Sequence, residues 1–174
     1  MRHLIATIFF AIATFAPAEA DAVNCQIAPS ENPNINYAIN PSVTFRWNPD
    51  VSFAINPDVS FSINPNVTFQ YNPDVTHSIN PEVNPALNPT RGPWKGFFVC
   101  SLDGRVVGAS VIANNQVMVA FAGDKWIGYF VATGEGGYNF FNRANRWEGF
   151  LVPTESGGYV FFNRQNNWTL SLKR

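Results

Sequence analysis

Histidine, cysteine, long hydrophobic runs and dense basic clusters are all scarce in this chain. The 174 residues include two histidines and two cysteines, and only 13% of them are charged. After the first twenty residues, no apolar run is long enough to cross a bilayer as a helix. Lysine and arginine never form the dense run expected of a nucleic-acid binder. We therefore expect no integral membrane segment in the mature chain and no nucleic-acid partner.

The shortage of reactive side chains also argues against an enzyme. One histidine remains after the first twenty residues, His77, and it stands inside a repeat, where a serine–histidine–acid triad is hard to place. The sequence has no metal-ligand spacing, and no helix or lysine follows the glycine-rich stretch 134–137, so it lacks a phosphate loop. We expect no catalytic residue, no metal site and no cofactor.

The first twenty residues are typical of a secretory signal. A short basic start, Met1–His3, precedes an apolar run over 4–15, and Ala18-Glu19-Ala20 supplies small residues for cleavage. We expect residues 1–20 to be removed and the protein to be secreted, periplasmic or on the cell surface. In such a compartment, Cys25 and Cys100 are expected to form an intramolecular disulfide, with free thiols or an intermolecular bond as the alternatives.

The dipeptide Asn-Pro recurs every eight residues from Asn32 to Asn80, and then every four residues at Asn84 and Asn88. Counted from the asparagine, the fourth, sixth and eighth residues of each octad are apolar, mostly Val, Phe and Ile. This alternation predicts a short strand with one apolar face, and Asn-Pro-Asp predicts a turn. The asparagines and aspartates supply too few converging oxygens for calcium, so we interpret them as turn formers.

The predicted fold class is all-β, with an octad tract followed by a small antiparallel β domain. After an N-terminal segment, 21–31, the tract 32–81 can form a β-solenoid, a meander or turns with unpaired strands. Residues 82–93 are predicted to be an extended linker, because regular ladders cannot form with Asn-Pro every four residues. The β domain is predicted to occupy residues 94–174.

A second repeat, 21 residues long, begins at Trp126 and again at Trp147. Each copy predicts two strands, with Gly-Gly at one turn and Asn-Arg-x-Asn at the other. Further strands are expected at 96–101, 105–112 and 116–122. About seven or eight short strands suit a small antiparallel barrel, sandwich or meander.

The recurring aromatic residues of this domain have two interpretations. They can form the core, because a small β domain needs large side chains to bury enough area. Alternatively, one ring per copy stacks on a sugar while its Asn and Arg neighbours bind hydroxyls. The candidate ligand-binding residues are Tyr138, Asn142, Arg143, Tyr159, Asn163 and Arg164. Two equivalent sets would favour a polysaccharide or another cell-surface polymer as the partner.

Charge is divided unevenly between the two halves. Residues 21–90 hold one arginine and six carboxylates, a net charge of −5, whereas residues 91–174 hold nine cations and five carboxylates, a net charge of +4. The halves are therefore expected to attract each other, or the basic half to meet an acidic surface.

Two functions fit these features. The first is an exported, non-enzymatic repeat protein that binds a glycan or surface polymer through its C-terminal β domain. The second is a structural protein of the surface or matrix that self-associates through open strand edges of the octad tract.

Overall fold

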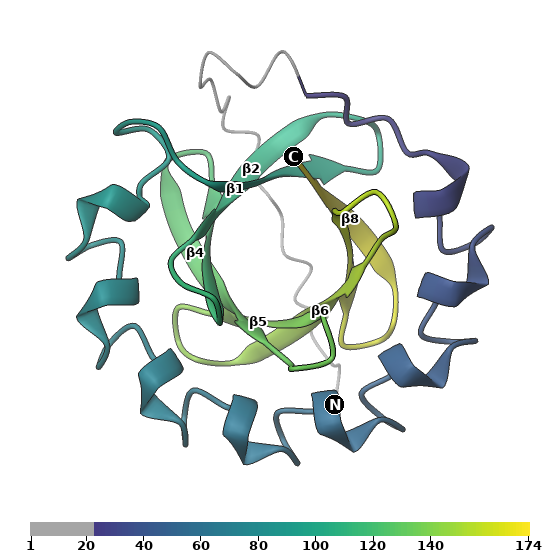
Figure 1. Ribbon diagram of the computed structural model, residues 1–174, viewed down its shortest axis with the longest axis horizontal. Helices are drawn as coiled ribbons and strands as arrows, with labels where there is room; N and C mark the ends of the chain where they lie inside the picture. Colours follow the sequence, from purple (N-terminus) through teal and green to yellow (C-terminus); the bar gives the residue numbers. More distant parts are fainter. Residues whose placement is uncertain (1–22) are drawn as a thin grey trace, which may run out of the picture.

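The computed structural model describes residues 23–174, so the expected signal sequence lies outside the described residues. Viewed down the shortest axis of the molecule, the C-terminal half forms a closed ring of strands. The octad tract curves around the outside of that ring as a belt of short helices (Figure 1). The two repeats thus build two concentric layers.

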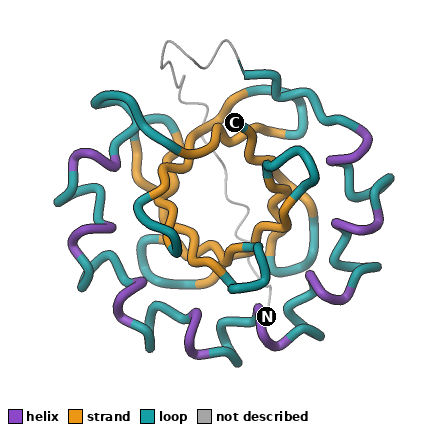
Figure 2. The backbone as a smooth tube through the Cα atoms, viewed as in Figure 1, coloured by secondary structure: helices purple, strands orange, loops and turns teal. Residues whose placement is uncertain are grey.

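The inner layer is a closed barrel of eight antiparallel strands, in which each strand pairs with its neighbours in sequence and β8 pairs with β1 (Figure 2). The all-β class is confirmed, and of the three architectures expected for the domain the barrel is observed. The strands are β1 Gly96–Ser101, β2 Val106–Ile112, β3 Val117–Ala122, β4 Lys125–Ala132, β5 Tyr138–Asn142, β6 Trp147–Pro153, β7 Tyr159–Asn163 and β8 Trp168–Lys173.

Each copy of the 21-residue repeat forms two strands, as predicted. The first copy supplies β4 and β5, and the second supplies β6 and β7. Residues 133–137 and 154–158 make turns at one barrel end, whereas the Asn-Arg-x-Asn turns lie at the other. In those latter turns Asn145 and Asn166 have φ of 57° and 60°, a region that asparagine tolerates better than most residues.

Two hydrophobic cores lie on either side of the barrel wall. Inside the barrel, rings from successive strands pack edge to face, such as Phe140 and Phe161 with centroids 5.8 Å apart. Outside, aromatic and β-branched residues pack under the belt, against Ile39, Trp47, Ile79 and Leu87. The octad tract therefore shares a core with the barrel and covers its outer face.

The outer layer consists of three-residue 3₁₀ helices, each covering the sixth to eighth residues of an octad from η3 to η9. They are η2 Pro29–Glu31, η3 Tyr37–Ile39, η4 Phe45–Trp47, η5 Phe53–Ile55, η6 Phe61–Ile63, η7 Phe69–Tyr71, η8 His77–Ile79 and η9 Pro85–Leu87. Between them, Asn-Pro begins a turn closed by hydrogen bonds from the fourth and fifth N–H groups to the asparagine carbonyl, as at Asn56. The predicted Asn-Pro turns are therefore present.

The asparagine side chain explains why Asn recurs at this position. Its Oδ1 accepts a hydrogen bond from the N–H two residues later, as between Asn56 and Asp58 at 2.9 Å. Its Nδ2 donates to the carbonyl of the proline one octad earlier, as from Asn56 to Pro49 at 3.0 Å and from Asn80 to Pro73 at 3.0 Å. One amide thus caps its own turn and ties it to the preceding octad.

The strands predicted for the octads were wrong. Across the described part of the tract the chain makes turns and 3₁₀ helices instead of β ladders, so neither the solenoid nor the meander forms. A 3₁₀ helix has three residues per turn, so only one of its three side chains can face the barrel. That residue is the eighth, such as Ile55 and Ile63, while the fourth and sixth residues face outward.

The extended linker predicted at 82–93 was also wrong over most of its length. Asn84 and Pro85 stand at the fifth and sixth positions of an ordinary octad that begins at Asn80. Asn84 caps η9 by accepting a hydrogen bond from the backbone N–H of Ala86, and Leu87 is buried like the other eighth residues. The belt therefore continues to the turn at Asn88.

Belt and barrel are joined by ion pairs across the layers. Arg164 pairs with Asp58 at 3.1 Å, Arg143 pairs with Glu82, and Arg46 pairs with Glu135 at 3.5 Å. In addition, the buried Asn139 donates to the carbonyl of Ile55 at 2.9 Å. Two of these ion pairs join a belt carboxylate to a barrel arginine, which is the expected sense, whereas the pair between Arg46 and Glu135 has the opposite sense.

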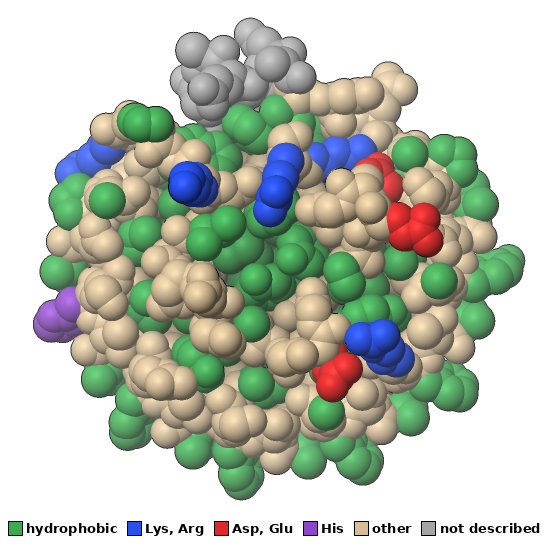
Figure 3. Space-filling view, in the orientation of Figure 1, with side chains coloured by type: hydrophobic (Ala, Val, Ile, Leu, Met, Phe, Trp, Pro, Cys, Tyr) green, Lys and Arg blue, Asp and Glu red, His purple; other side chains and the backbone are tan. Residues whose placement is uncertain are grey.

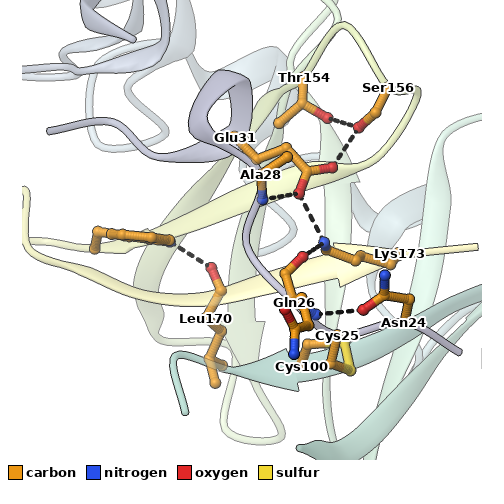
Figure 4. A network of polar contacts seen from close by, with 11 residues as sticks. Asn24, Cys25, Gln26, Ala28, Glu31, Cys100, Thr154, Ser156, Leu170 and Lys173 are labelled. Carbon is orange, nitrogen blue, oxygen red and sulfur yellow. Dashed lines mark hydrogen bonds and ion pairs between the residues drawn. A yellow bond between two sulfur atoms is a disulfide. The ribbon is translucent and has the colours of Figure 1, made fainter. Parts of the chain in front are cut away.

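The segment that precedes the belt is attached to β1, the first strand after the belt. Cys25 and Cys100 of β1 form a disulfide, which confirms the predicted pairing. Beside it, Glu31 accepts hydrogen bonds from Lys173 at 2.7 Å and Ser156 at 2.7 Å (Figure 4). Burial alone would raise the pKa of Glu31, but the hydrogen bonds from Lys173, Ser156 and Ala28 lower it below its ordinary value.

Candidate functional site

The predicted sugar-binding sets are divided between the two ends of the barrel. Tyr138 and Tyr159 begin β5 and β7 at one end, where their rings pack edge to face with centroids 5.5 Å apart. Asn142 and Asn163 end the same strands at the opposite end. Each asparagine side chain there accepts hydrogen bonds from the backbone of its own turn. The tyrosine of each set therefore does not meet its asparagine.

The two candidate arginines are engaged with protein groups. Arg143 lies over the ring of Trp126 at 4.5 Å from its centroid and pairs with Glu82. Arg164 repeats this arrangement one copy later, over Trp147 at 4.5 Å and paired with Asp58. A guanidinium held between a ring and a carboxylate is positioned to join belt to barrel.

The tyrosine pair lies beside a basic and aromatic surface at its end of the barrel. Tyr159 contacts Phe97, over which Arg174 lies at 5.1 Å from the ring centroid. Burial and the neighbouring Tyr138 raise the pKa of Tyr159 to about 12, so its hydroxyl stays protonated at neutral pH. A groove of about 360 Å³ lies close by, lined by Trp94, Lys95, Gly96, Phe98, Ile112 and Arg174.

The largest apolar feature of the surface is on the belt. The Val, Ile, Phe and Tyr residues at the fourth and sixth positions of the octads point to solvent and are 52% to 61% exposed. Soluble monomers rarely expose so extended an apolar surface without a binding role. We call these twelve residues the apolar collar: Ile35, Val43, Val51, Val59, Val67, Val75, Val83, Tyr37, Phe45, Phe53, Phe61 and Phe69.

The collar is visible as apolar side chains that protrude along the edge of the molecule (Figure 3). His77 takes the place of the sixth-position phenylalanine in its octad and is also exposed. A polar ring at this position shows that the turn does not require an apolar side chain there. The repeated aromatic residues at the sixth position are therefore not explained by the folding of the belt alone.

Three of the belt's charged side chains are ion-paired with barrel groups. Asp58, Glu82 and Arg46 each have an ion-pair partner on the barrel. Asp74 accepts a hydrogen bond from the side-chain amide of Asn145 at 3.5 Å. An apolar surface whose neighbouring charges are partly paired favours contact with another protein surface.

The sequence pattern predicted that the collar residues share the apolar face of a strand with the eighth residues of the octads. The signal that could have corrected this is Asn84-Pro85. A second Asn-Pro at positions five and six of an octad shows that these positions form a turn.

Comparison of the chain with protein-family models, with curated proteins and with solved structures finds no match. Within residues 23–174, no helix could span a membrane, and no three His, Cys, Asp or Glu side chains gather closely enough to hold a metal ion.

Proposed function

We propose that this is an exported, non-enzymatic structural protein that associates with copies of itself through the apolar collar. The observation that carries the proposal is the outward direction of twelve exposed Val, Ile, Phe and Tyr side chains on the belt. Removing such side chains from water is the main driving force for protein association. The contact surface is the collar, because the octads offer no open strand edge.

The collar also has the repetition expected of an assembly surface. Most octads present a β-branched fourth residue and an aromatic sixth residue with a polar residue between them, as in Val59, Ser60 and Phe61. A contact that forms between one pair of octads can form between others, so weak contacts add up along the belt.

The test is sedimentation velocity of the disulfide-bonded chain over a range of concentrations. The collar variant carries Phe45→Ser, Phe53→Ser, Phe61→Ser and Phe69→Ser. The control variant carries Leu102→Ser and Ile112→Ser, the exposed large apolar residues outside the belt. We expect wild type and the control to associate with rising concentration, while the collar variant stays monomeric. Association of the collar variant at wild-type strength would refute the proposal.

Glycan binding is a second candidate function, now limited to Tyr138 and Tyr159. The observation in its favour is that these partly buried rings meet at one barrel end, beside Phe97 and Arg174. A pull-down with cell-wall and capsular polysaccharides is expected to retain the wild type and to lose Tyr138→Ala. Equal retention of both proteins, or of neither, would count against a sugar site there.

A further inference from the structure

The apolar surface is confined to one part of the molecule. Among the described residues, the large apolar side chains that are more than a third exposed belong to the collar, apart from Leu102 and Ile112. The belt lies at the periphery when the molecule is viewed along the barrel axis (Figure 1). The collar is therefore on the rim, while the two barrel ends form the faces.

The curvature of the belt distributes the collar over several directions within one plane. Successive octads follow the outside of the barrel, from beside β8 past β6 and β5 to beside β4 (Figure 1). Their outward side chains cannot all meet one flat surface, because a convex arc touches a plane over only a few neighbouring octads. A partner that covers one part of the rim leaves the rest exposed.

A second copy of the chain fits this surface better than a lipid bilayer does. The octads interleave charged side chains, among them Asp50, Asp58 and Arg46, with the apolar rows. Placing such charges in hydrocarbon is costly, whereas a protein contact can keep them at its polar margin. The ion pairs with the barrel also reduce the repulsion between two copies of an otherwise acidic belt.

We infer that the protein forms flat, single-layer sheets in which barrels lie side by side with parallel axes, each touching more than two neighbours through its rim. This inference rests on the proposed function and adds the geometry of the assembly. Contacts that do not close on themselves generate extended arrays, and contacts confined to a rim keep the array in one plane.

Electron microscopy of negatively stained protein and atomic force microscopy of the same sample test the inference. We expect wild type to give layers of uniform height, one barrel thick. A sector variant carries Val51→Ser, Phe53→Ser, Val59→Ser and Phe61→Ser. It removes the outward apolar side chains of two neighbouring octads and leaves the rest of the collar intact. We expect it to give narrow strips in place of sheets, while Leu102→Ser with Ile112→Ser leaves the sheets unchanged.

Other outcomes separate the sheet from the proposed function. Wild type that stays monomeric at every concentration would overturn both. Association that stops at a closed dimer, or columns stacked through the barrel ends, would overturn the sheet alone. If the wild type floats with phosphatidylcholine and phosphatidylglycerol vesicles and no longer associates with itself, the partner of the collar is a lipid bilayer and the inference is overturned.

Discussion

Replacing Phe150 with tyrosine should stabilise the fold, although it adds a polar atom to a buried site. The two barrel repeats place Tyr129 and Phe150 at equivalent positions. Tyr129 stacks on Phe141 with centroids 5.8 Å apart, and Phe150 stacks on Phe162 with centroids 5.6 Å apart. The two sites differ in one hydroxyl group.

That hydroxyl matters because of the asparagine in the following turn. The Tyr129 hydroxyl donates to Asn145 Oδ1 at 2.5 Å. Burial and the charge of Asp74 raise the pKa of Tyr129, so it remains a donor. In the second copy, Asn166 Oδ1 is buried without a hydrogen-bond partner. Phe150→Tyr would supply the missing donor, which is worth about 1 kcal/mol of unfolding free energy.

Urea unfolding followed by tryptophan fluorescence measures this difference, at a concentration where the chain is monomeric. Tyr129→Phe should lose about 1–3 kcal/mol, because it orphans Asn145 Oδ1. In an Asn166→Gly background, which keeps a left-handed backbone but removes the acceptor, Phe150→Tyr should bring no gain. Equal stabilisation with and without the Asn166 side chain would refute the reasoning.

Three further changes test the packing of belt and barrel. Ile79→Ala should lose about 2–5 kcal/mol of unfolding free energy, because the Ile79 side chain is 1% exposed. Phe69→Ala should change the unfolding free energy of the monomer by about 0.5 kcal/mol or less, because Phe69 is 56% exposed. Equal losses would contradict the outward direction of the collar. Because the pKa of Glu31 is lowered on folding, its contribution is present above the ordinary value of 4.5 and is lost as pH falls through the folded pKa. The difference in unfolding free energy between wild type and Glu31→Gln should therefore decrease below pH 4.5, as measured by urea unfolding at a series of pH values. A difference that does not change with pH would show that the charged contact with Lys173 is not the source of the stabilisation. Gly149→Ala would place a Cβ 2.3 Å from the Phe162 carbonyl oxygen and should lose about 3 kcal/mol or more of unfolding free energy. Gly104→Ala should lose about 1 kcal/mol, because Gly104 has φ of +83° but open space around it. Thermal unfolding of the two variants measures the difference.

The barrel could be predicted from sequence to the level of strand pairs. Gly-Gly and Asn-Arg-x-Asn impose tight turns at fixed offsets, and the residues between them have strong strand preferences. Closure into a barrel does not follow from those local signals, because the pairing of β8 with β1 joins segments about seventy residues apart. The disulfide could be predicted from compartment and number, since Cys25 and Cys100 are the only cysteines.

The belt could not be predicted in the same way, because its alternation of apolar residues has two physical causes. Ile55 is apolar because it packs on the barrel, and Phe53 is apolar while it faces solvent. A pattern of period two treats both as one face of a strand. The residues of the candidate sugar site do not come together in space, also because of strand geometry. Tyr138 and Asn142 are four residues apart in one strand, which separates them along the barrel axis.

The two repeats fit each other despite their different lengths. Arg143 and Arg164 are equivalent residues 21 positions apart, and their partners Glu82 and Asp58 are 24 positions apart, which equals three octads. The belt therefore runs around the barrel against the order of the strands, and three of its octads accompany one two-strand unit. A belt that lies outside the barrel must cover a longer arc than the barrel wall for the same angle, so it needs more residues. Three octads have 24 residues, compared with 21 in one two-strand unit. Deleting one octad would move one carboxylate away from its arginine while leaving every turn intact, so the register between the layers depends on the number of octads.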